Sequence, residues 1–212
     1  MNEAPVPGSL VIVSAPSGGG KTSLTRALVP YLAQRDVRAT LSVSYTTRAM
    51  RAGEVDGEHY HFVDVPQFRA MIAGDAFLEH AEVFGRHYGT GRASTDALLA
   101  AGVDVMLDID WQGARQVRQR AEAVTSVFIL PPSLAELERR LRGRGQDSDE
   151  VIARRMREAR SEIAHYDEYD HLIVNEDFER SLEALAAIFL ERRQRQAMQL
   201  RAHPGLIDRL LA

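Results

Sequence analysis

The sequence contains no cysteine. Disulfide bonds and thiolate-ligated metal sites are therefore excluded, and the composition fits a reducing compartment such as the cytoplasm. No apolar stretch approaches the roughly 20 residues that a membrane-spanning helix needs, and residues 1–8 lack the basic and apolar regions of a secretory signal. Internal repeats and low-complexity segments are also missing. We therefore expect a cytoplasmic globular protein with no membrane partner.

Excess positive charge is missing as well. The 30 acidic residues outnumber the 26 lysines and arginines, which gives a net charge of −4. Proteins that bind nucleic acid usually carry a basic surface, so the overall charge does not suggest such a partner. The chain has 212 residues, of which 45% are hydrophobic. This size suits one domain with insertions and a sizeable core.

The most informative stretch runs from Leu10 to Leu28. An apolar strand-like run is followed by a glycine loop, Ala15-Pro-Ser-Gly-Gly-Gly-Lys-Thr22, and then by a helical pattern. Glycines let successive backbone N–H groups turn toward phosphate oxygens, and the helix adds its positive end. Lys21 would reach the β- and γ-phosphates, and the Thr22 hydroxyl would hold Mg²⁺. The alternative is a flexible turn that happens to precede a lysine.

One position of this loop departs from the general pattern G-x-x-x-x-G-K-[ST]. Ala15 stands where the first glycine is usual. Alanine costs little there if its backbone has an ordinary negative φ, so we interpret it as the mark of a subfamily.

A second landmark is the apolar run that begins at Val103 and ends in Asp108 and Asp110. It places carboxylates at the carboxyl end of a buried strand, where ligands bind in open α/β sheets. Beside a phosphate loop, such a carboxylate commonly helps to hold Mg²⁺. The alternative is a pair of structural aspartates, which would also need partners.

Strand and helix patterns alternate along most of the chain. Further strands are expected at 39–44, 126–130 and 171–174, a helix capped by Ser94 is expected through Ala101, and one closing helix is expected from Phe178 to about Ala202. Alternation of this kind predicts an α/β fold with a parallel sheet wrapped by helices on both faces. Two segments, 45–95 and 136–165, do not fit the alternation and read as inserts.

The first insert carries Arg48 and Arg51 in a stretch with few other charges. Guanidinium groups bind phosphate through paired hydrogen bonds, so this loop could hold an anion, although a bare R-x-x-R is more often two solvated side chains. His59 and His61 alternate on an expected strand. No third ligand follows at a suitable spacing, so a metal site is not expected there.

The second insert is rich in arginine. A phosphoryl-transfer enzyme needs cations over the migrating group, delivered by an element that closes over it. Arg144 stands between two glycines and is well placed to swing. A solvated helix face and an RNA-binding patch are the alternatives, and we assign a role to only three of the eight arginines. The eight are Arg139, Arg140, Arg142, Arg144, Arg154, Arg155, Arg157 and Arg160.

Taken together, these motifs closely resemble the guanylate kinase family, whose members phosphorylate GMP from ATP. The resemblance covers about residues 8 to 192, and its most specific part is the Thr-Thr-Arg-x-x-Arg block. The segments that carry it are residues 14–22, 44–54, 57–60, 89–90, 107–113, 143–145 and 173–177. Small departures are Tyr45, Met50 and Trp111, of which Met50 would loosen its loop and leave the phosphate grip in place.

The resemblance implies a fold and a division of the chain. The fold would be a P-loop NTPase core with a parallel sheet wrapped by helices, an insert that binds the nucleoside monophosphate, and an arginine-rich lid. The single domain would have its core at 8–44, 96–135 and 166–202, its GMP-binding insert at about 45–95, and its lid at about 136–165.

The resemblance also implies how GMP is bound. Two arginines and two tyrosines would grip the phosphate, namely Arg48, Arg51, Tyr60 and Tyr88. Glu79 would read the base, with help from Ser44, Thr90 and Asp110. Glu82 is a competing candidate for the carboxylate, and Glu79 is preferred on its match to the family motif alone.

For the donor, the resemblance implies contacts from the loop and from two residues outside it. These are Ala15, Pro16, Ser17, Gly18, Gly19, Gly20, Lys21, Thr22, Ser23, Arg140 and Asn175. The catalytic residues would be Lys21, Arg48, Arg144 and Arg155, with Mg²⁺ near Thr22 and Asp108.

The expected activity is therefore Mg²⁺-dependent phosphorylation of GMP and dGMP by ATP, in purine nucleotide metabolism. Three other functions stay open at this point: a kinase for another phosphorylated small molecule such as a ribose bisphosphate, a non-catalytic module of the same fold that binds phosphorylated partners, and RNA binding through the arginine insert. The sequence does not determine the oligomeric state, for which a homodimer is one candidate.

Overall fold

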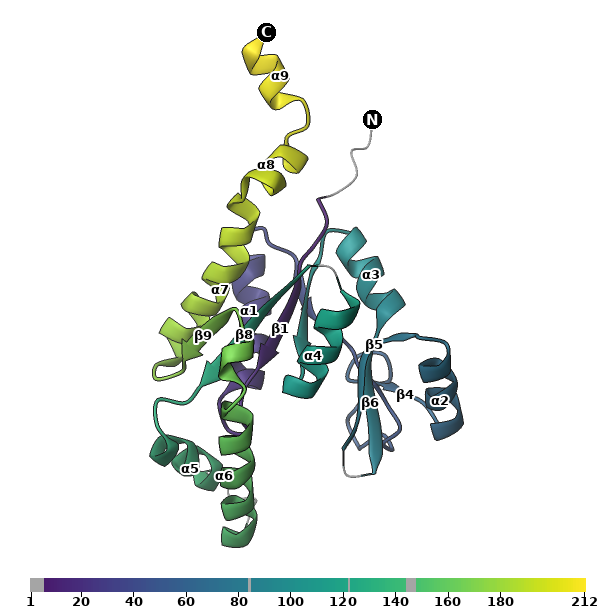
Figure 1. Cartoon of the computed structure of the whole chain (residues 1–212), viewed down its shortest axis with the longest axis vertical. Helices are drawn as coiled ribbons and strands as arrows, with labels where there is room; N and C mark the ends of the chain where they lie inside the picture. Colours follow the sequence, from purple (N-terminus) through teal and green to yellow (C-terminus); the bar gives the residue numbers. More distant parts are fainter. Residues whose placement is uncertain (1–5, 84, 122, 144–147) are drawn as a thin grey trace.

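The computed structural model describes residues 6–83, 85–121, 123–143 and 148–212. Its elements form a central five-stranded sheet with helices on both faces, and a smaller four-stranded sheet beside it (Figure 1). The strands are β1 (Leu10–Ser14), β2 (Ala39–Leu41), β3 (Tyr45–Thr46), β4 (His61–Phe62), β5 (Phe77–Val83), β6 (Arg86–Gly91), β7 (Asp104–Asp108), β8 (Val124–Leu130) and β9 (His171–Val174). The helices are α1 (Lys21–Ala33), α2 (Val65–Ala73), α3 (Arg92–Ala100), α4 (Trp111–Arg120), α5 (Leu134–Gly143), α6 (Asp149–Ile163), α7 (Phe178–Gln194), α8 (Gln196–Ala202) and α9 (Leu206–Leu211), with one 3₁₀ turn, η1 (Tyr166–Glu168).

The central sheet has the order β2-β7-β1-β8-β9, and all of its strand pairs are parallel. This arrangement confirms the predicted fold class. Parallel strands place their carboxyl ends at one edge of the sheet, so the loop after β1 and the aspartates after β7 lie at the same edge. Register supports this, because Val13 of β1 lies beside Asp108 of β7.

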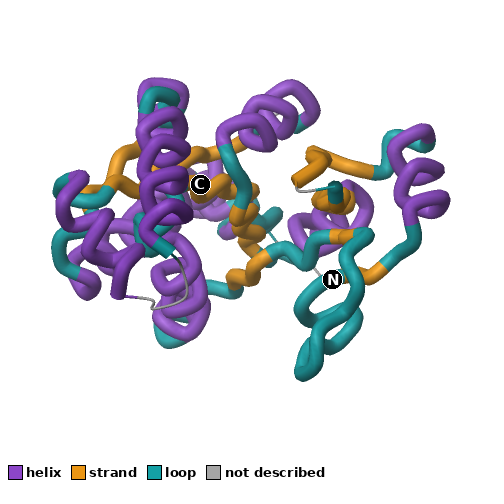
Figure 2. The backbone as a smooth tube through the Cα atoms, turned by 90° about the horizontal axis from the view of Figure 1, so that it is seen from below, coloured by secondary structure: helices purple, strands orange, loops and turns teal. Residues whose placement is uncertain are grey.

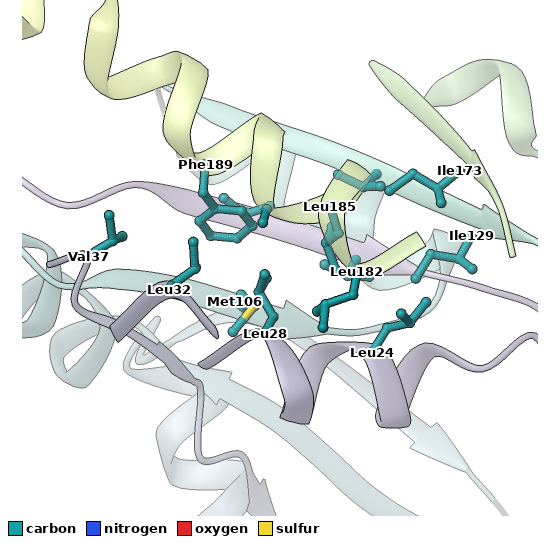
Figure 3. Packing of buried hydrophobic residues seen from close by; sticks show 14 residues of the cluster. Leu24, Leu28, Leu32, Val37, Met106, Ile129, Ile173, Leu182, Leu185 and Phe189 are labelled. Atoms are coloured by element: carbon teal, nitrogen blue, oxygen red, sulfur yellow. The ribbon is translucent and has the colours of Figure 1, made fainter. Parts of the chain in front are cut away.

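Alternating side chains of β1 build two cores. Val11 and Val13 face α1 and α7, where they pack with Leu28, Leu185 and other buried apolar residues (Figure 3). Leu10 and Ile12 face the opposite side, where they join a cluster with residues of α4 and β7. A strand whose neighbouring side chains are all buried is covered on both faces, which holds the loop after it in place.

The smaller sheet has the order β4-β3-β6-β5, with β3 and β6 antiparallel and β5 and β6 antiparallel. It lies within the first predicted insert. Seen from below, helices surround strands on one side of the molecule, and strands, long loops and further helices lie on the other (Figure 2).

Three local expectations were wrong. The second strand ends at Leu41, because the chain leaves the central sheet there and enters the smaller one at Tyr45. Ser94 does not cap α3: the cap is Gly91, and the Ser94 hydroxyl donates to the Gly91 carbonyl. The closing helix is interrupted at Arg195, whose extended backbone separates α7 from α8.

The helices in the described part of the chain do not have the properties of membrane spans. None combines the length and the apolar composition that crossing a bilayer would take.

Candidate active site

The glycine loop joins β1 to α1 at the carboxyl edge of the central sheet. Gly18 and Gly20 have φ values of 89° and 97°, which side-chain-bearing residues rarely adopt. A Cβ on Gly20 would also lie 2.3 Å from the Asn175 amide nitrogen, so no side chain fits there. Ala15 is not among the non-glycine residues with positive φ in the described part of the chain, so its backbone tolerates the methyl group.

This loop encloses a cavity of about 270 Å³. Its lining consists of nine consecutive residues from Ala15 to Ser23, together with Asp110 and Glu162. All nine predicted donor-binding residues of the loop therefore line one cavity. The positive end of α1 and the backbone N–H groups of the loop make this cavity chemically suited to a phosphate.

Lys21 forms an ion pair with Asp108, and its ammonium group also lies 3.4 Å from the Ile109 carbonyl. The lysine side chain is 20% exposed and the aspartate side chain 31%. A cation held at the carboxyl edge, next to the loop, is suitably placed to meet a phosphate oxygen.

Thr22 and Asp108 were predicted to hold Mg²⁺. The described residues contain no group of three or more histidines, aspartates or glutamates that could hold a metal ion. Magnesium does not need one, because it usually takes one or two protein oxygens and completes its shell with phosphates and water. An exposed threonine hydroxyl at the start of α1 and a partly exposed carboxylate at the end of β7 fit that requirement.

Asn175 and Arg140 lie against the loop. The buried Asn175 amide donates to the Gly19 carbonyl at 2.9 Å. The Asn175 backbone carbonyl accepts from the Arg140 guanidinium at 2.8 Å, and Glu136 accepts from the same guanidinium at 2.8 Å. Both predicted donor-binding residues outside the loop are thus connected to it.

Two further arginines of the second insert, Arg144 and Arg155, were predicted to be catalytic. Arg155 lies on α6 and is half-buried. Arg144 lies outside the described residues.

On the smaller sheet, Arg48 is held by Glu54. Its two terminal nitrogens donate to the two carboxylate oxygens at 2.9 and 2.7 Å, and Glu54 also accepts from the Arg51 backbone N–H at 2.7 Å. These contacts lower the pKa of Glu54 to about 2, with the Arg48 hydrogen bonds as the largest cause. The carboxylate therefore fixes the arginine in one orientation.

Two tyrosines and a phenylalanine complete this region. The Arg48 guanidinium lies 5.2 Å from the centre of the Tyr60 ring and 5.6 Å from that of Phe62. The Tyr60 and Tyr88 rings meet edge to face at 6.1 Å. Burial raises the pKa of Tyr60, so its hydroxyl stays protonated and can donate. Arg48, Tyr60 and Tyr88 are brought together as predicted, whereas Arg51 is exposed.

Glu79 and Thr90 form the buried part of the site. They are paired neighbours on β5 and β6, and the Thr90 hydroxyl donates to Glu79 at 2.6 Å. Glu79 is 6% exposed. Burial raises its pKa above the ordinary value of 4.5, the Thr90 hydrogen bond opposes this, and the charge of Asp110 adds to it. The competing candidate Glu82 lies on the same strand with its side chain 61% exposed.

The remaining predicted residues flank this pair. Asp110 caps α4 by accepting from the Gly113 N–H at 2.9 Å. Ser44 is half-buried in the link between β2 and β3. The two histidines do not share a face: His59 lies in a turn and accepts from the Val55 N–H, and His61 packs on Tyr45.

Sequence reasoning missed three residues that shape the site. Glu54 was part of the recognised motif, but its pairing with Arg48 depends on the turn between them. A Cβ on Gly113 would lie 3.3 Å from Glu79, so this glycine leaves room for the carboxylate. Glu162 accepts from the Ser17 N–H at 3.0 Å and comes from a distant helix. No sequence pattern brings 17 and 162 together.

Comparison with known proteins gives one consistent result. A family model described as guanylate kinase matches residues 8–192. Proteins named guanylate kinase from Salmonella choleraesuis strain SC-B67 and Escherichia coli strain K12 are each 57% identical to this chain over 205 residues. These alignments cover 97% of this chain and 98% of each relative.

A solved structure agrees with these sequences. The crystal structure of guanylate kinase from Anaplasma phagocytophilum matches with a TM-score of 0.70 and 34% identity, covering 91% of this chain and 90% of that one.

Proposed function

Because the chain belongs to the guanylate kinase family, we propose that it transfers the γ-phosphoryl group of ATP to GMP or dGMP. The observation that carries this proposal is that one chain holds both the buried Glu79–Thr90 pair on the smaller sheet and the glycine-loop cavity of the central sheet. The first is suited to a guanine base, and the second to a triphosphate. A nucleotide kinase requires one site for the acceptor base and a separate site for the donor triphosphate.

Guanine offers two neighbouring donors, N1–H and the N2 amino group, and one carboxylate can accept both. Adenine presents an acceptor at its N1, which would face the Glu79 carboxylate unfavourably. Mismatched buried polar groups cost about 1–3 kcal/mol each. Glu79 is buried and already accepts one hydrogen bond from Thr90, so its orientation is fixed before a base arrives.

The acceptor phosphate would meet Arg48, Arg51, Tyr60 and Tyr88. The guanidinium of Arg48 is held by Glu54 and lies over the Tyr60 ring, which reduces the rotamer entropy lost on binding. No protein general base is needed, because a phosphate monoester is largely dianionic near neutral pH.

Transfer then depends on position and charge. Lys21, Arg140, Arg144 and Arg155 would stabilise the charge that spreads over the migrating phosphoryl group, in a site from which water is excluded. Asn175 holds the loop through Gly19 and so supports the donor site. Magnesium, when bound through Thr22 and Asp108, would neutralise charge on the donor phosphates.

The two other functions of this fold are less well supported. A kinase for a phosphorylated molecule without a base would have no use for a buried carboxylate that can accept two guanine donors. A non-catalytic module would be expected to have lost loop residues, whereas Lys21, Thr22 and Asp108 are all present.

The segment boundaries 8–44, 96–135 and 166–202 for the core, 45–95 for the acceptor insert and 136–165 for the lid are part of this proposal. A cytoplasmic location and a homodimer stay predictions. The cysteine-free composition supports the first.

The direct test is ADP production that depends on both GMP and Mg²⁺. Lys21→Ala should lower kcat by about 100-fold or more. Glu79→Gln should lower kcat/KM for GMP by about 100-fold with KM for ATP unchanged. The matched control is Glu82→Gln, which removes an exposed carboxylate from the same strand. Wild-type use of GMP by the Glu79 variant would overturn the guanine assignment, and transfer to ribose phosphates would overturn the acceptor.

A further inference from the structure

Glu162 contacts the glycine loop through its carboxylate and has no role in the proposed mechanism. It accepts from the Ser17 backbone N–H at 3.0 Å and lines the loop cavity together with Lys21 and Asp110. It belongs to the last turn of α6, the long helix of the second insert. This hydrogen bond therefore joins that helix to the loop across 145 residues of sequence.

Helix stability does not explain a glutamate at this position. The last turn of a helix carries partial negative charge, which disfavours a carboxylate. Burial raises the pKa of Glu162, and the nearby charges of Asp110 and Glu158 add to that effect, whereas Ser17 and Lys21 oppose it. The carboxylate is held on the loop against these costs.

An incoming triphosphate would meet this carboxylate directly. Phosphate loops bind anions through the backbone N–H groups and the lysine of the loop. In this cavity the Ser17 N–H already donates to Glu162, and a second anion in about 270 Å³ would experience like-charge repulsion. Either the carboxylate moves or the phosphate binds less tightly.

We propose that Glu162 is a positioning residue that couples ATP binding to the position of α6. Its carboxylate ties the end of α6 to Ser17, and the triphosphate displaces it, which releases the helix. The proposal rests on ATP as the donor, and it adds the contact through which donor binding reaches the second insert. By reciprocity, release of the Glu162 carboxylate from Ser17 strengthens ATP binding.

The chain contains a reporter for this movement. Trp111, the single tryptophan, stacks on His165 with ring centres 3.7 Å apart and planes at 15°. Trp111 begins α4, and His165 follows the end of α6 by two residues. A shift of the end of α6 would change this stack and with it the tryptophan emission.

The experiment compares wild type, Glu162→Gln and Glu158→Gln, each titrated with ATP in the absence of GMP. Glu158 is the matched control, because it lies one turn earlier on α6 and is 52% exposed, 3.6 Å from Arg154. Calorimetry gives the Kd for ATP, and Trp111 emission follows α6. A separate titration with GMP and an unfolding curve report whether each variant is folded.

We expect Glu162→Gln to bind ATP about fivefold more tightly, with the Kd for GMP unchanged. The glutamine amide oxygen can still accept from the Ser17 N–H, so the variant's emission before ATP should match that of wild type and should change at lower ATP concentrations. Glu158→Gln should behave as wild type. Equal or weaker ATP binding by Glu162→Gln, or the same gain in the control, would overturn the proposal. Wild-type emission unaffected by ATP would do so without any variant.

Failure of this inference is distinguishable from failure of the proposed function. A wild-type protein that phosphorylates GMP, with ATP affinity that ignores Glu162, removes only the coupling. A wild-type protein that does not bind ATP removes both.

Discussion

Arg48 and Glu54 show how one loop residue prepares another. The carboxylate accepts from both terminal nitrogens of the guanidinium, which is the geometry that phosphate would also use. Glu54 therefore orients Arg48 but also competes for it. Orientation should dominate, because the guanidinium retains further donors and Glu54 is fixed by the Arg51 N–H.

We predict that Glu54→Gln raises KM for GMP by about tenfold, because a neutral amide holds the Arg48 guanidinium less firmly than a carboxylate does. KM for ATP should stay unchanged. Steady-state assays with each substrate varied would measure both, and Glu58→Gln, an exposed change in the same loop, is the control. A lower KM for GMP would show that competition outweighs orientation.

The Arg48–Glu54 pair should not respond to pH in any ordinary assay. The pKa of Glu54 in the folded protein is about 2, below its ordinary value of 4.5. A lowered pKa means that the stabilising contribution is present above the ordinary value and is lost as pH falls through about 2.

The pKa of Glu79 is shifted in the opposite direction to that of Glu54, because burial raises it. Its carboxylate therefore takes up a proton at a higher pH than an ordinary glutamate, and the protonated form cannot accept both guanine donors. We predict that GMP affinity falls as pH decreases toward and through this raised pKa, while ATP affinity changes less. Calorimetric titrations at several pH values would test this, and a GMP Kd that is flat down to pH 4.5 would contradict it.

A substitution at Gly113 should have opposite effects on the stability of the fold and on the use of GMP. It lies in the first turn of α4, where alanine would favour the helix by up to about 1 kcal/mol. A Cβ there would also approach the Glu79 carboxylate to 3.3 Å. We predict that Gly113→Ala leaves the unfolding midpoint equal or higher and lowers kcat/KM for GMP by about tenfold. Gln112→Ala, an exposed change beside it, should affect neither, and a normal GMP rate in the Gly113 variant would contradict the prediction.

At the scale of elements, α7 is anchored to the central sheet by a charged contact. Asp104 of β7 is 2% exposed and accepts from the Ser9 N–H at 2.7 Å and from the Arg193 guanidinium at 3.0 Å. It lies at the start of β7, at the opposite end of that strand from Asp108. The contact therefore supports the fold and not the chemistry.

We predict that Asp104→Asn lowers the free energy of unfolding by about 2 kcal/mol, because Arg193 loses its anionic partner. Catalytic constants should not change. Glu191→Gln removes the exposed partner of Arg195 on the same helix and should cost less than about 0.5 kcal/mol. Urea denaturation would measure both, and equal effects would show that burial at Asp104 adds nothing.

The elements that could be predicted were those with strong local signals. Apolar runs identified β1, β7, β8 and β9. The errors came from tertiary context. β2 ends three residues early because the chain crosses to another sheet, and Gly91 caps α3 because β6 leads directly into that helix.

At the scale of the whole molecule, α8 and α9 extend away from both sheets at the C-terminal end (Figure 1). Their large apolar side chains are exposed, with Leu210 at 71% and Leu211 at 82%. We predict that a chain ending at Gln194 keeps the wild-type kcat and shifts the unfolding midpoint by less than about 2 °C, because little buried surface is removed. Thermal unfolding and gel filtration would test this, and a large fall accompanied by later elution would show that the tail joins copies of the chain.

The kinds of residues in the candidate site could be predicted from the sequence, but the contacts between them could not. Motif spacing identified the loop, the paired arginines and the aspartates after β7, because each is local in sequence. The pairing of Glu54 with Arg48, the closeness of Gly113 to Glu79 and the hydrogen bond of Glu162 with the Ser17 N–H connect residues across turns or across the molecule. Such contacts depend on three-dimensional packing, which no local pattern encodes.

The backbone enters the smaller sheet between Leu41 and Tyr45 and leaves it at Gly91–Arg92, where α3 begins. Gln116 and Arg120 of α4 also hydrogen-bond to the backbone of β5. Outside the smaller sheet, Gly113 of α4 leaves space for the Glu79 carboxylate. Burial raises the pKa of Glu79, and Asp110, the N-terminal cap of α4, adds to that rise. Substrate choice is in this sense modular. Replacing the segment between Leu41 and Arg92, together with the α4 residues that face it, should give a transferase for a different phosphorylated acceptor. Such an enzyme would still use ATP as its phosphoryl donor.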